Sequence, residues 1–242
     1  MKVSIVGIGP GGGTALTGQA RQVLTDCDLI VGYTVYIDLL RGEFGHKDLR
    51  STAMRRETDR CRMAIEEALR HQHVALVCSG DPGVYGLAGL VYEIAQEYDP
   101  IEIEVVPGIT AACSGAAILG APLIHDFAII SLSDLLTPWE KIEKRLSLAA
   151  QGDFVICLYN PASKKRRDYL KKACDALLLY KSATTICGLV RQIGRDGQAG
   201  QILTLSELRE AQVDMFTTVY IGNEQTRVIN GKMITPRGYR LS

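Results

Sequence analysis

Short apolar runs that alternate with segments of helical periodicity constrain the fold of this chain more than any other feature. Strand-like runs are predicted at residues 3–6, 29–31, 74–78 and 101–106, and helices between them, for example at 58–70 and 85–98. This order is typical of βαβ units, in which a largely parallel sheet is covered on both faces. The first half of the chain is therefore expected to form an α/β domain.

A second series of strand-like runs follows at residues 127–131, 154–159, 184–190 and 217–222. The small-residue stretch 115–122 between the two series is interpreted as a hinge. We expect two α/β domains, at 1–118 and 119–242, with the active-site cleft between them. Asn230-Gly231 lies between the predicted strand 226–229 and another short strand, which indicates a hairpin and predicts a mixed sheet in the second domain.

The charge balance and the cysteines exclude several classes of protein. Lysine plus arginine equals aspartate plus glutamate, 27 each, so no net field favours nucleic acid or an anionic membrane. No apolar run approaches the roughly 18 residues that cross a bilayer, and the amino terminus is predicted as a strand instead of a signal peptide. The seven scattered cysteines include no Cys-x-x-Cys pair, so we expect reduced core residues in a cytoplasmic protein.

The first glycine-rich motif, residues 7–13, directly follows the opening strand and contains the Gly-x-Gly-x-x-Gly pattern of dinucleotide-binding folds. In those folds the helix begins inside the motif, and an acidic residue ends the second strand. Here Pro10 has no amide hydrogen, a third consecutive glycine delays the helix, and the second strand ends in Gly32-Tyr33. These departures disfavour NAD and leave a tight turn without a ligand as an alternative.

Two further glycine-bearing loops follow the third and fourth predicted strands. In residues 79–86 glycine lets the backbone approach a ligand, and Asp81 supplies a fixed acceptor; an ordinary turn would also explain the motif. In residues 106–112 Thr110 can cap the next helix, which alone would explain that motif. Because parallel strands end at one edge of their sheet, all three loops are expected to meet where open α/β sheets bind ligands.

These motifs resemble those of the tetrapyrrole methylases, whose first domain carries Gly-x-Gly-Pro-Gly, Ser/Gly-Gly-Asp-Pro and Pro-Gly-x-Thr/Ser-Ala loops in this order. The resemblance runs from Met1 to the carboxyl end. Three longer stretches, 79–90, 125–139 and 233–239, resemble members that methylate C17 of precorrin-3B or cobalt-precorrin-3 and contract the ring in cobalamin synthesis. The resemblance implies a methyltransferase that uses S-adenosylmethionine and two α/β domains.

The resemblance also implies which positions bind S-adenosylmethionine. In the first domain they are Pro10, Ser79, Gly80, Asp81, Val84, Thr110 and Ala111, and in the second Tyr159, Gln192 or Ile193, and Thr217 or Thr218. The sulfonium is already activated, so methyl transfer needs no metal or nucleophilic side chain; the methyl has only to be held in line with an electron-rich carbon.

The acetate and propionate arms of such a macrocycle call for cations, and arginine suits carboxylates well. The candidates are Arg55 and Arg56, the basic run 164–167, and Arg237, although each could also be a solvated helix end. Ring contraction would be helped by a general acid or base. The titratable candidates are His125, Asp126 and Asp134, followed by Tyr33 and Glu57; a lone histidine is also compatible with a structural role.

The resemblance further implies a homodimer and no protein-bound metal, because the cysteine cluster that some members use for an iron-sulfur centre is missing. Cobalt would arrive only inside the substrate, and the residues leave the cobalt and metal-free forms open. One alternative is the same fold acting on another acceptor, such as another precorrin position, uroporphyrinogen, a diphthamide precursor or ribosomal RNA. The long matching stretches argue against it, as does neutral charge in the case of RNA. Another is a non-catalytic protein that binds a nucleotide or a corrinoid.

Overall fold

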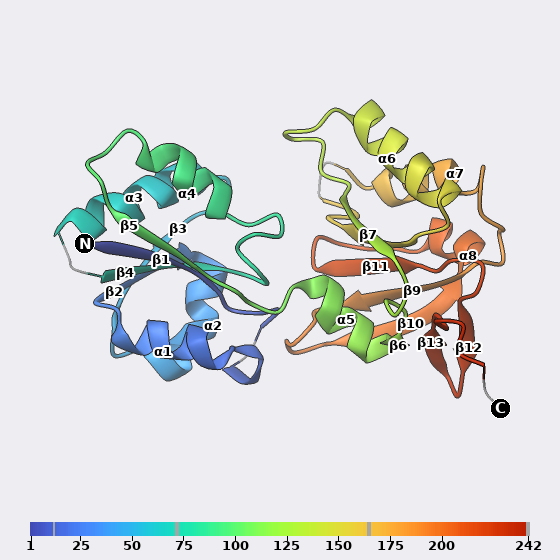
Figure 1. Ribbon diagram of the computed structural model, residues 1–242, viewed down its shortest axis with the longest axis horizontal. Coiled ribbons are helices and arrows are strands. Elements are labelled where there is room, and N and C mark those ends of the chain that lie inside the picture. The colour runs from blue at the N-terminus through green and yellow to red at the C-terminus, as the bar shows by residue number, and fades with distance from the viewer. Residues whose placement is uncertain (12, 71–72, 164–165, 241–242) are drawn as a thin grey trace. The chain divides into compact units, whose positions relative to one another are not determined.

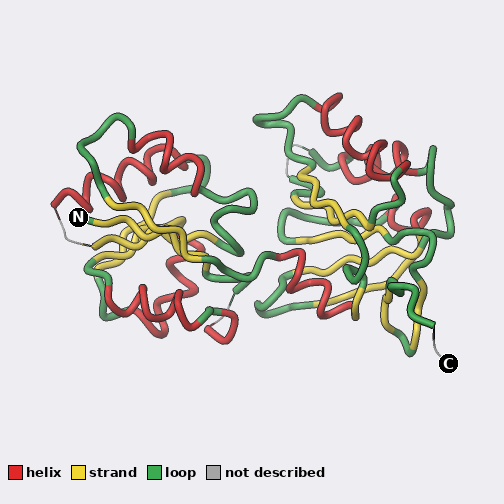
Figure 2. The backbone as a smooth tube through the Cα atoms, in the orientation of Figure 1, coloured by secondary structure: helices red, strands yellow, loops and turns green. Residues whose placement is uncertain are grey.

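A computed structural model describes residues 1–11, 13–70, 73–163 and 166–240 of the chain. By its internal contacts the chain divides into two compact units, Met1–Ala111 and Ala112–Ser242. Each unit has a five-stranded sheet. Figures 1 and 2 show that each sheet has its own helices. The expected α/β class with two sheets is confirmed, whereas the predicted domain ranges, 1–118 and 119–242, stay a prediction.

The first unit is built on a parallel sheet in the order β3-β2-β4-β1-β5. Its strands are β1 (Lys2–Gly7), β2 (Leu29–Tyr33), β3 (Asp48–Thr52), β4 (His73–Cys78) and β5 (Glu102–Val106). Four of them lie where apolar runs predict strands. The edge strand β3 escapes prediction because Leu49 is its only large apolar residue.

Helices cover both faces of this sheet (Figure 1). They are the short 3-10 helix η1 (Gly13–Ala15), α1 (Gly18–Asp26), α2 (Thr34–Phe44), α3 (Glu57–Arg70) and α4 (Ala88–Ala95). Alternate strand residues point to opposite faces, so Ile5 packs in the core with α3 and α4, and Val6 in the core with α1 and α2. The helix after the first motif is delayed as predicted, since α1 begins only at Gly18, capped by Thr17.

The second unit has a mixed sheet in the order β10-β9-β11-β8-β7. Its strands are β7 (Phe127–Ser131), β8 (Val155–Tyr159), β9 (Ile186–Arg191), β10 (Ala199–Thr204) and β11 (Thr217–Ile221). Only β7 and β8 are parallel; the remaining neighbours are antiparallel. The prediction of a mixed sheet is confirmed, but its antiparallel strands are β9, β10 and β11 and not the carboxyl-terminal hairpin.

That hairpin belongs to a third, small sheet in the order β12-β13-β6, made by β12 (Arg227–Ile229), β13 (Lys232–Ile234) and β6 (Gly120–Ala121). Its turn is predicted correctly, because Asn230 and Gly231 both have positive φ, 50° and 72°. The prediction that these strands extend the main sheet is wrong.

Helices α6 (Trp139–Gln151), α7 (Tyr169–Leu177) and α8 (Leu205–Glu210) pack on one face of the second sheet, over a core that includes Val219. On the other face lies α5 (Ala111–Leu119), whose Ala112 carbonyl accepts a bond from the Tyr220 hydroxyl at 2.9 Å. The hinge predicted at 115–122 is therefore wrong, since these residues continue α5 and form β6. Within the described ranges, no helix has the length and apolar character to cross a membrane.

Candidate functional site

Three glycine-bearing loops meet at the carboxyl edge of the first sheet, as the sequence predicts. They follow β1, β4 and β5, which are adjacent strands. Gly9 and Gly80 pair through their backbones, with the Gly80 amide 2.7 Å from the Gly9 carbonyl oxygen. A Cβ on Gly108 would lie only 2.1 Å from the Gly80 carbonyl oxygen. Glycine is therefore required because the loops touch backbone to backbone, and Gly9 and Gly80 also have positive φ, 70° and 68°.

Asp81 ties two of these loops together. Its Oδ1 accepts a bond from the Gly83 amide at 2.8 Å, and its Oδ2 accepts one from the Gly108 amide at 3.0 Å. Hydrogen bonds to a carboxylate are stronger than neutral ones. The sequence predicts Asp81 as an acceptor for the cofactor, whereas in the structure both carboxylate oxygens accept from the protein's own backbone.

The other cofactor positions predicted in the first unit lie on the same three loops, half-buried beside these glycines: Pro10, Ser79, Val84, Thr110 and Ala111. Next to them Ile109 is 44 % exposed, and Tyr85 is 57 % exposed with a φ of 54°. A nucleoside needs close backbone approach and some apolar surface, and both are present at this edge. The residues therefore fit an adenosine-bearing cofactor.

In the second unit the predicted positions also share one edge. Tyr159 ends β8, Gln192 and Ile193 follow β9, and Thr217 begins the antiparallel β11. The Gln192 amide bonds to the Phe216 carbonyl at 3.1 Å, and Gln192 has a φ of 50°. Strained non-glycine backbone often accompanies functional sites. The Tyr159 hydroxyl accepts a bond from the Ala112 amide at 2.6 Å. That these residues contact a cofactor stays a prediction.

The predicted substrate-binding cations differ in their surroundings. Arg55 is exposed in the loop after β3 and has a φ of 64°, whereas Arg56 pairs with Asp59 at 2.6 Å. Arg237 is exposed after β13. In the basic run, Lys164 and Lys165 lie outside the described residues, Arg166 pairs with Asp134, and Arg167 is exposed.

The structure separates the predicted acid–base residues of the second unit. His125 and Asp126 precede β7, with His125 Nδ1 3.7 Å from Asp126 Oδ2. Asp134 follows β7, so a five-residue strand, about 15 Å long, lies between them. His125 and Asp134 therefore cannot act together at one reacting bond. In the first unit Tyr33 ends β2, and Glu57 begins α3.

Arg60, which the sequence analysis missed, lies 4 % exposed at the carboxyl edge of the first sheet. Its guanidinium donates to Thr52 Oγ1 at 2.9 Å and to the Ala53 carbonyl at 3.1 Å, and it lies over the Tyr33 ring, 5.7 Å from the centroid. One signal could have found it: Arg60 shares the buried stripe of α3 with Ala64 and Ala68, four and eight residues on.

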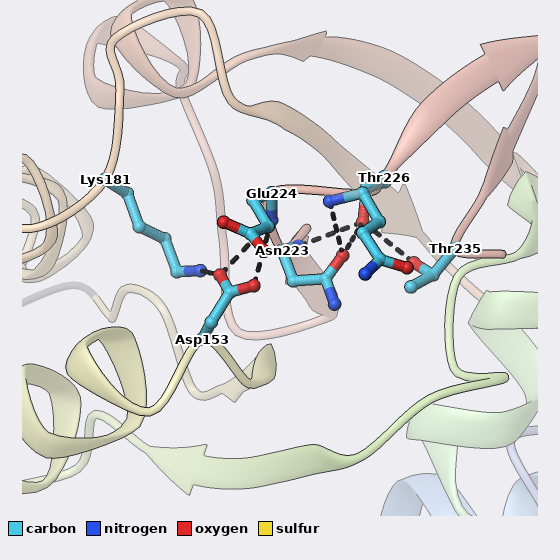
Figure 3. Close-up of polar contacts among 7 residues, drawn as sticks. Asp153, Lys181, Asn223, Glu224, Thr226 and Thr235 are labelled. Atoms are coloured by element: carbon cyan, nitrogen blue, oxygen red, sulfur yellow. Dashed lines mark hydrogen bonds and ion pairs between the residues drawn. The ribbon is translucent and has the colours of Figure 1, made fainter. Parts of the chain in front are cut away.

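A pocket of about 640 Å³ opens at the other end of the second sheet, where Asp153 precedes β8. Lys181, whose side chain is 4 % exposed, donates to Asp153 Oδ1 at 2.9 Å (Figure 3). Asn223 and Thr226 bond to each other beside them, and the Glu224 amide donates to Asp153. Among the residues that the structure describes, no predicted site residue lines this pocket. Its polar groups tie the turn after β11 to the start of β8. In the described part of the chain, no group of three or more His, Cys, Asp or Glu side chains could hold a metal.

Comparison with known proteins agrees with this architecture. The profile of the family Tetrapyrrole (Corrin/Porphyrin) Methylases matches residues 2–209. A Salmonella typhimurium protein named "Probable cobalt-factor III C(17)-methyltransferase" is 46 % identical over 99 % of this chain and 100 % of its own length.

Two solved structures extend the comparison. The crystal structure of the methyltransferase CobJ is 36 % identical, with a TM-score of 0.89 over 97 % of this chain and 99 % of that one. Uroporphyrin-III C-methyl transferase from Thermus thermophilus, complexed with S-adenosyl homocysteine, shares the fold at 20 % identity, with a TM-score of 0.71 over 92 % of each chain. From its profile match and its near full-length relatives, this chain belongs to the tetrapyrrole methylase family.

Proposed function

We propose that this protein is a methyltransferase that moves a methyl group from S-adenosylmethionine to C17 of precorrin-3B or its cobalt counterpart, with contraction of the ring, in cobalamin synthesis. The observation that carries the proposal is the 46 % identity to a C(17)-methyltransferase along the whole of both chains. The CobJ structure, with 36 % identity and a TM-score of 0.89, supports the same activity.

The cofactor proposed here, S-adenosylmethionine, supplies a methyl group on a positively charged sulfur. The chain's own contribution is then to bind and orient it. Support comes from the three loops of the first unit, whose backbone is held by the Gly9–Gly80 pairing and the Asp81 bonds, all made within the protein itself. A site that is already organised does not lose ordering entropy on binding, which favours a near-attack geometry. A relative of the same fold was crystallised with S-adenosyl homocysteine, which is consistent with this assignment.

For the substrate, we propose that exposed arginines bind carboxylate arms of the macrocycle. Arg55 is the stronger candidate in the first unit, because Arg56 already pairs with Asp59. Arg237 is likewise exposed. Cobalt, if it takes part, comes as a component of the substrate.

We also propose a cytoplasmic homodimer. The seven cysteines form no disulfide among the described residues, and six are buried, which suits a reducing compartment. Light scattering of the purified protein should then give twice the chain mass of 26.4 kDa.

The activity can be tested by incubating the protein with S-adenosylmethionine carrying a labelled methyl group and, in separate reactions, cobalt-precorrin-3, precorrin-3B and uroporphyrinogen III. Mass spectrometry is expected to find one added methyl on one or both precorrin-3 forms and none on uroporphyrinogen, with the label at C17 by NMR. Methylation of uroporphyrinogen alone, or of none of the three, would overturn the proposal. A preference between the first two acceptors would decide whether cobalt belongs to the natural substrate.

A further inference from the structure

The loop between β7 and α6, residues 132–138, is anchored at both ends. Leu132 is fully buried in the core of the second unit, and its amide donates to the Tyr159 carbonyl at 2.9 Å. At the other end Trp139 begins α6 and packs against the Tyr169 ring, with 4.8 Å between centroids. The loop therefore starts beside the end of β8 and has a fixed course.

Between these anchors Asp134 holds the loop to the segment that leads into α7. Its Oδ1 lies 3.0 Å from Arg166 Nε, and its Oδ2 accepts a hydrogen bond from the Tyr169 hydroxyl. Arg166, whose side chain is only 17 % exposed, also donates to Ser133 Oγ at 3.3 Å. The bond to Asp134 raises the pKa of Tyr169, so this hydroxyl stays protonated and remains a donor. These charge-assisted bonds hold Ser133 and Asp134, the two residues directly before Leu135, in place.

The next two residues are apolar but largely exposed to solvent. Leu135 is 63 % exposed and Leu136 is 98 % exposed. Single exposed leucines are common, but here two are adjacent on a loop whose ordering costs conformational entropy. Since the second unit buries little of either side chain, the ordered loop yields an apolar contact only when something else covers it.

The position of the loop indicates which molecule covers these two leucines. Ser131 at the end of β7 is level with Tyr159 at the end of β8. The loop thus leaves the sheet at the edge that also carries Gln192 and Thr217. Open α/β sheets bind their small ligands beyond such an edge. A tetrapyrrole offers a broad apolar ring face and carboxylate arms. Arg167 is exposed and directly follows Arg166, which bonds to this loop, so it supplies a cation for such an arm.

We infer that Leu135 and Leu136 contact the apolar ring face of the tetrapyrrole acceptor, and that Asp134 is a positioning residue that holds them there. This inference rests on the proposed function. It gives Asp134 a role in binding through the loop and not in proton transfer, because its carboxylate is already committed to Arg166 and Tyr169.

The test compares the double variant Leu135→Ser/Leu136→Ser with Leu179→Ser, a control in which a leucine that is 76 % exposed after α7 is changed. In the double variant the KM for the precorrin-3 acceptor is expected to rise at least tenfold, as the loss of two apolar contacts implies. Its kcat, its affinity for S-adenosylhomocysteine by calorimetry, and its mass by light scattering are expected to match the wild type. The control is expected to leave all four unchanged.

A second variant, Asp134→Asn, separates positioning from acid–base chemistry. Asparagine keeps the shape and one acceptor for Tyr169 but loses the charge that Arg166 binds. The KM is expected to rise by less than in the leucine double variant, with an unchanged kcat and an unchanged dependence of kcat on pH. A loss of kcat of a hundredfold or more with a flattened pH profile would make Asp134 a general acid or base and overturn its positioning role.

Other outcomes are equally decisive. An unchanged KM in the double variant, or the same increase in Leu179→Ser, overturns the leucine contact. A change of mass in the double variant with an unchanged KM would show that the leucines contact a second copy of the chain and not the acceptor. The proposed function fails separately: if the wild type binds the macrocycle, seen as a change in its absorbance, but transfers no methyl, the activity is wrong, and the loop can still be tested by that binding.

Discussion

Asp81 joins two loops of the first unit through backbone amides of Gly83 and Gly108, at 2.8 and 3.0 Å. Bonds to a charged acceptor contribute about 1.5–3 kcal/mol each. In Asp81→Ala both are lost, the loop after β5 is released from the loop after β4, and the predicted cofactor contacts lose their geometry. We expect the affinity for S-adenosylhomocysteine to fall at least tenfold in isothermal titration calorimetry.

Asp81→Asn is the matched control, because an amide oxygen can still accept from one of the two glycine amides. It should bind with an affinity between those of the wild type and Asp81→Ala. If Asp81→Ala binds as tightly as the wild type, the loops that follow β4 and β5 do not form the cofactor site.

Gly108 allows the closest contact between these loops, since an added Cβ would lie 2.1 Å from the Gly80 carbonyl oxygen. The clash is with backbone, which cannot turn aside as a side chain can, so Gly108→Ala should lower stability by about 1–3 kcal/mol. Urea denaturation measures this change. Gly89→Ala is the control, because its Cβ on the exposed side of α4 meets nothing within 4 Å, and it should be neutral or slightly stabilising. Equal effects of the two changes would contradict the close loop contact.

Among the elements, α5 packs closely against the second sheet because the Tyr220 hydroxyl bonds to it and because Gly115 has no side chain. Tyr220 donates to the Ala112 carbonyl at 2.9 Å, and burial raises the pKa of this hydroxyl, which keeps it a donor. A Cβ on Gly115 would lie 2.3 Å from the same hydroxyl oxygen. Gly115→Ala should therefore destabilise the protein by about 1–3 kcal/mol through overpacking, and Tyr220→Phe by about 1 kcal/mol through the lost bond.

The double variant of these two residues tests whether they act on each other. Removing the hydroxyl removes the nearest atom that the new methyl would meet, so Gly115→Ala/Tyr220→Phe should cost less than the two single changes together. Thermal unfolding of the four proteins measures the coupling. Strict additivity would mean that the added methyl does not meet the Tyr220 hydroxyl and would contradict this close contact.

The elements also show which parts of the fold can be predicted from the sequence. Buried strands such as β1 and β4 are apolar over most of their length, and the Asn230-Gly231 turn is determined by two adjacent residues, so local pattern suffices for each. The edge strand β3 carries mostly polar residues, and its pairing with β2 depends on the rest of the sheet. Likewise 115–122 has the small residues of a hinge, but these residues belong to α5 and β6, and Gly115 is small because α5 passes close to Tyr220.

The same distinction applies to the candidate site. The three loops of the first unit could be predicted because each glycine motif directly follows its own strand, and parallel strands end at one edge. The partners of Asp134 could not, because Arg166 and Tyr169 are more than thirty residues further on, and only the packing of α7 brings them to the loop.

At the scale of the whole molecule, the buried cysteines allow the unfolding of each unit to be followed separately. Cys113 is exposed, whereas three buried thiols lie in the first unit and three in the second. Burial raises the pKa of Cys27 and Cys78 to about 11 and of Cys61 to about 12, so the thiols of the first unit stay protonated and shielded while it is folded. Pulsed thiol labelling read by mass spectrometry therefore follows the unfolding of each unit in the intact chain.

This readout can locate an acid-sensitive cluster at the amino end of the first sheet. His73 Nε2 lies 2.8 Å from Ser4 Oγ, which also donates to Glu104, and Lys2 pairs with Glu104 at 2.9 Å. Burial, with Lys2 as a further cause, lowers the pKa of His73 below 6.5, and the bond from Lys2 lowers the pKa of Glu104 below 4.5.

Protonation of either group is thus less favourable in the folded state than in the unfolded state. The stability of the first unit should be near its maximum at about pH 7.5. It should fall as the pH drops through 6.5, because the unfolded state binds a proton at His73 that the folded state does not, and fall again below about 4.5, because the same holds for Glu104. Urea unfolding at pH 7.5, 5.5 and 4.0, followed by labelling of Cys27, Cys61 and Cys78, measures both steps. In His73→Gln the upper step should disappear and the lower one remain, because glutamine can still bond to Ser4 but does not titrate. An upper step that persists in His73→Gln would show that another group in the first unit takes up the proton.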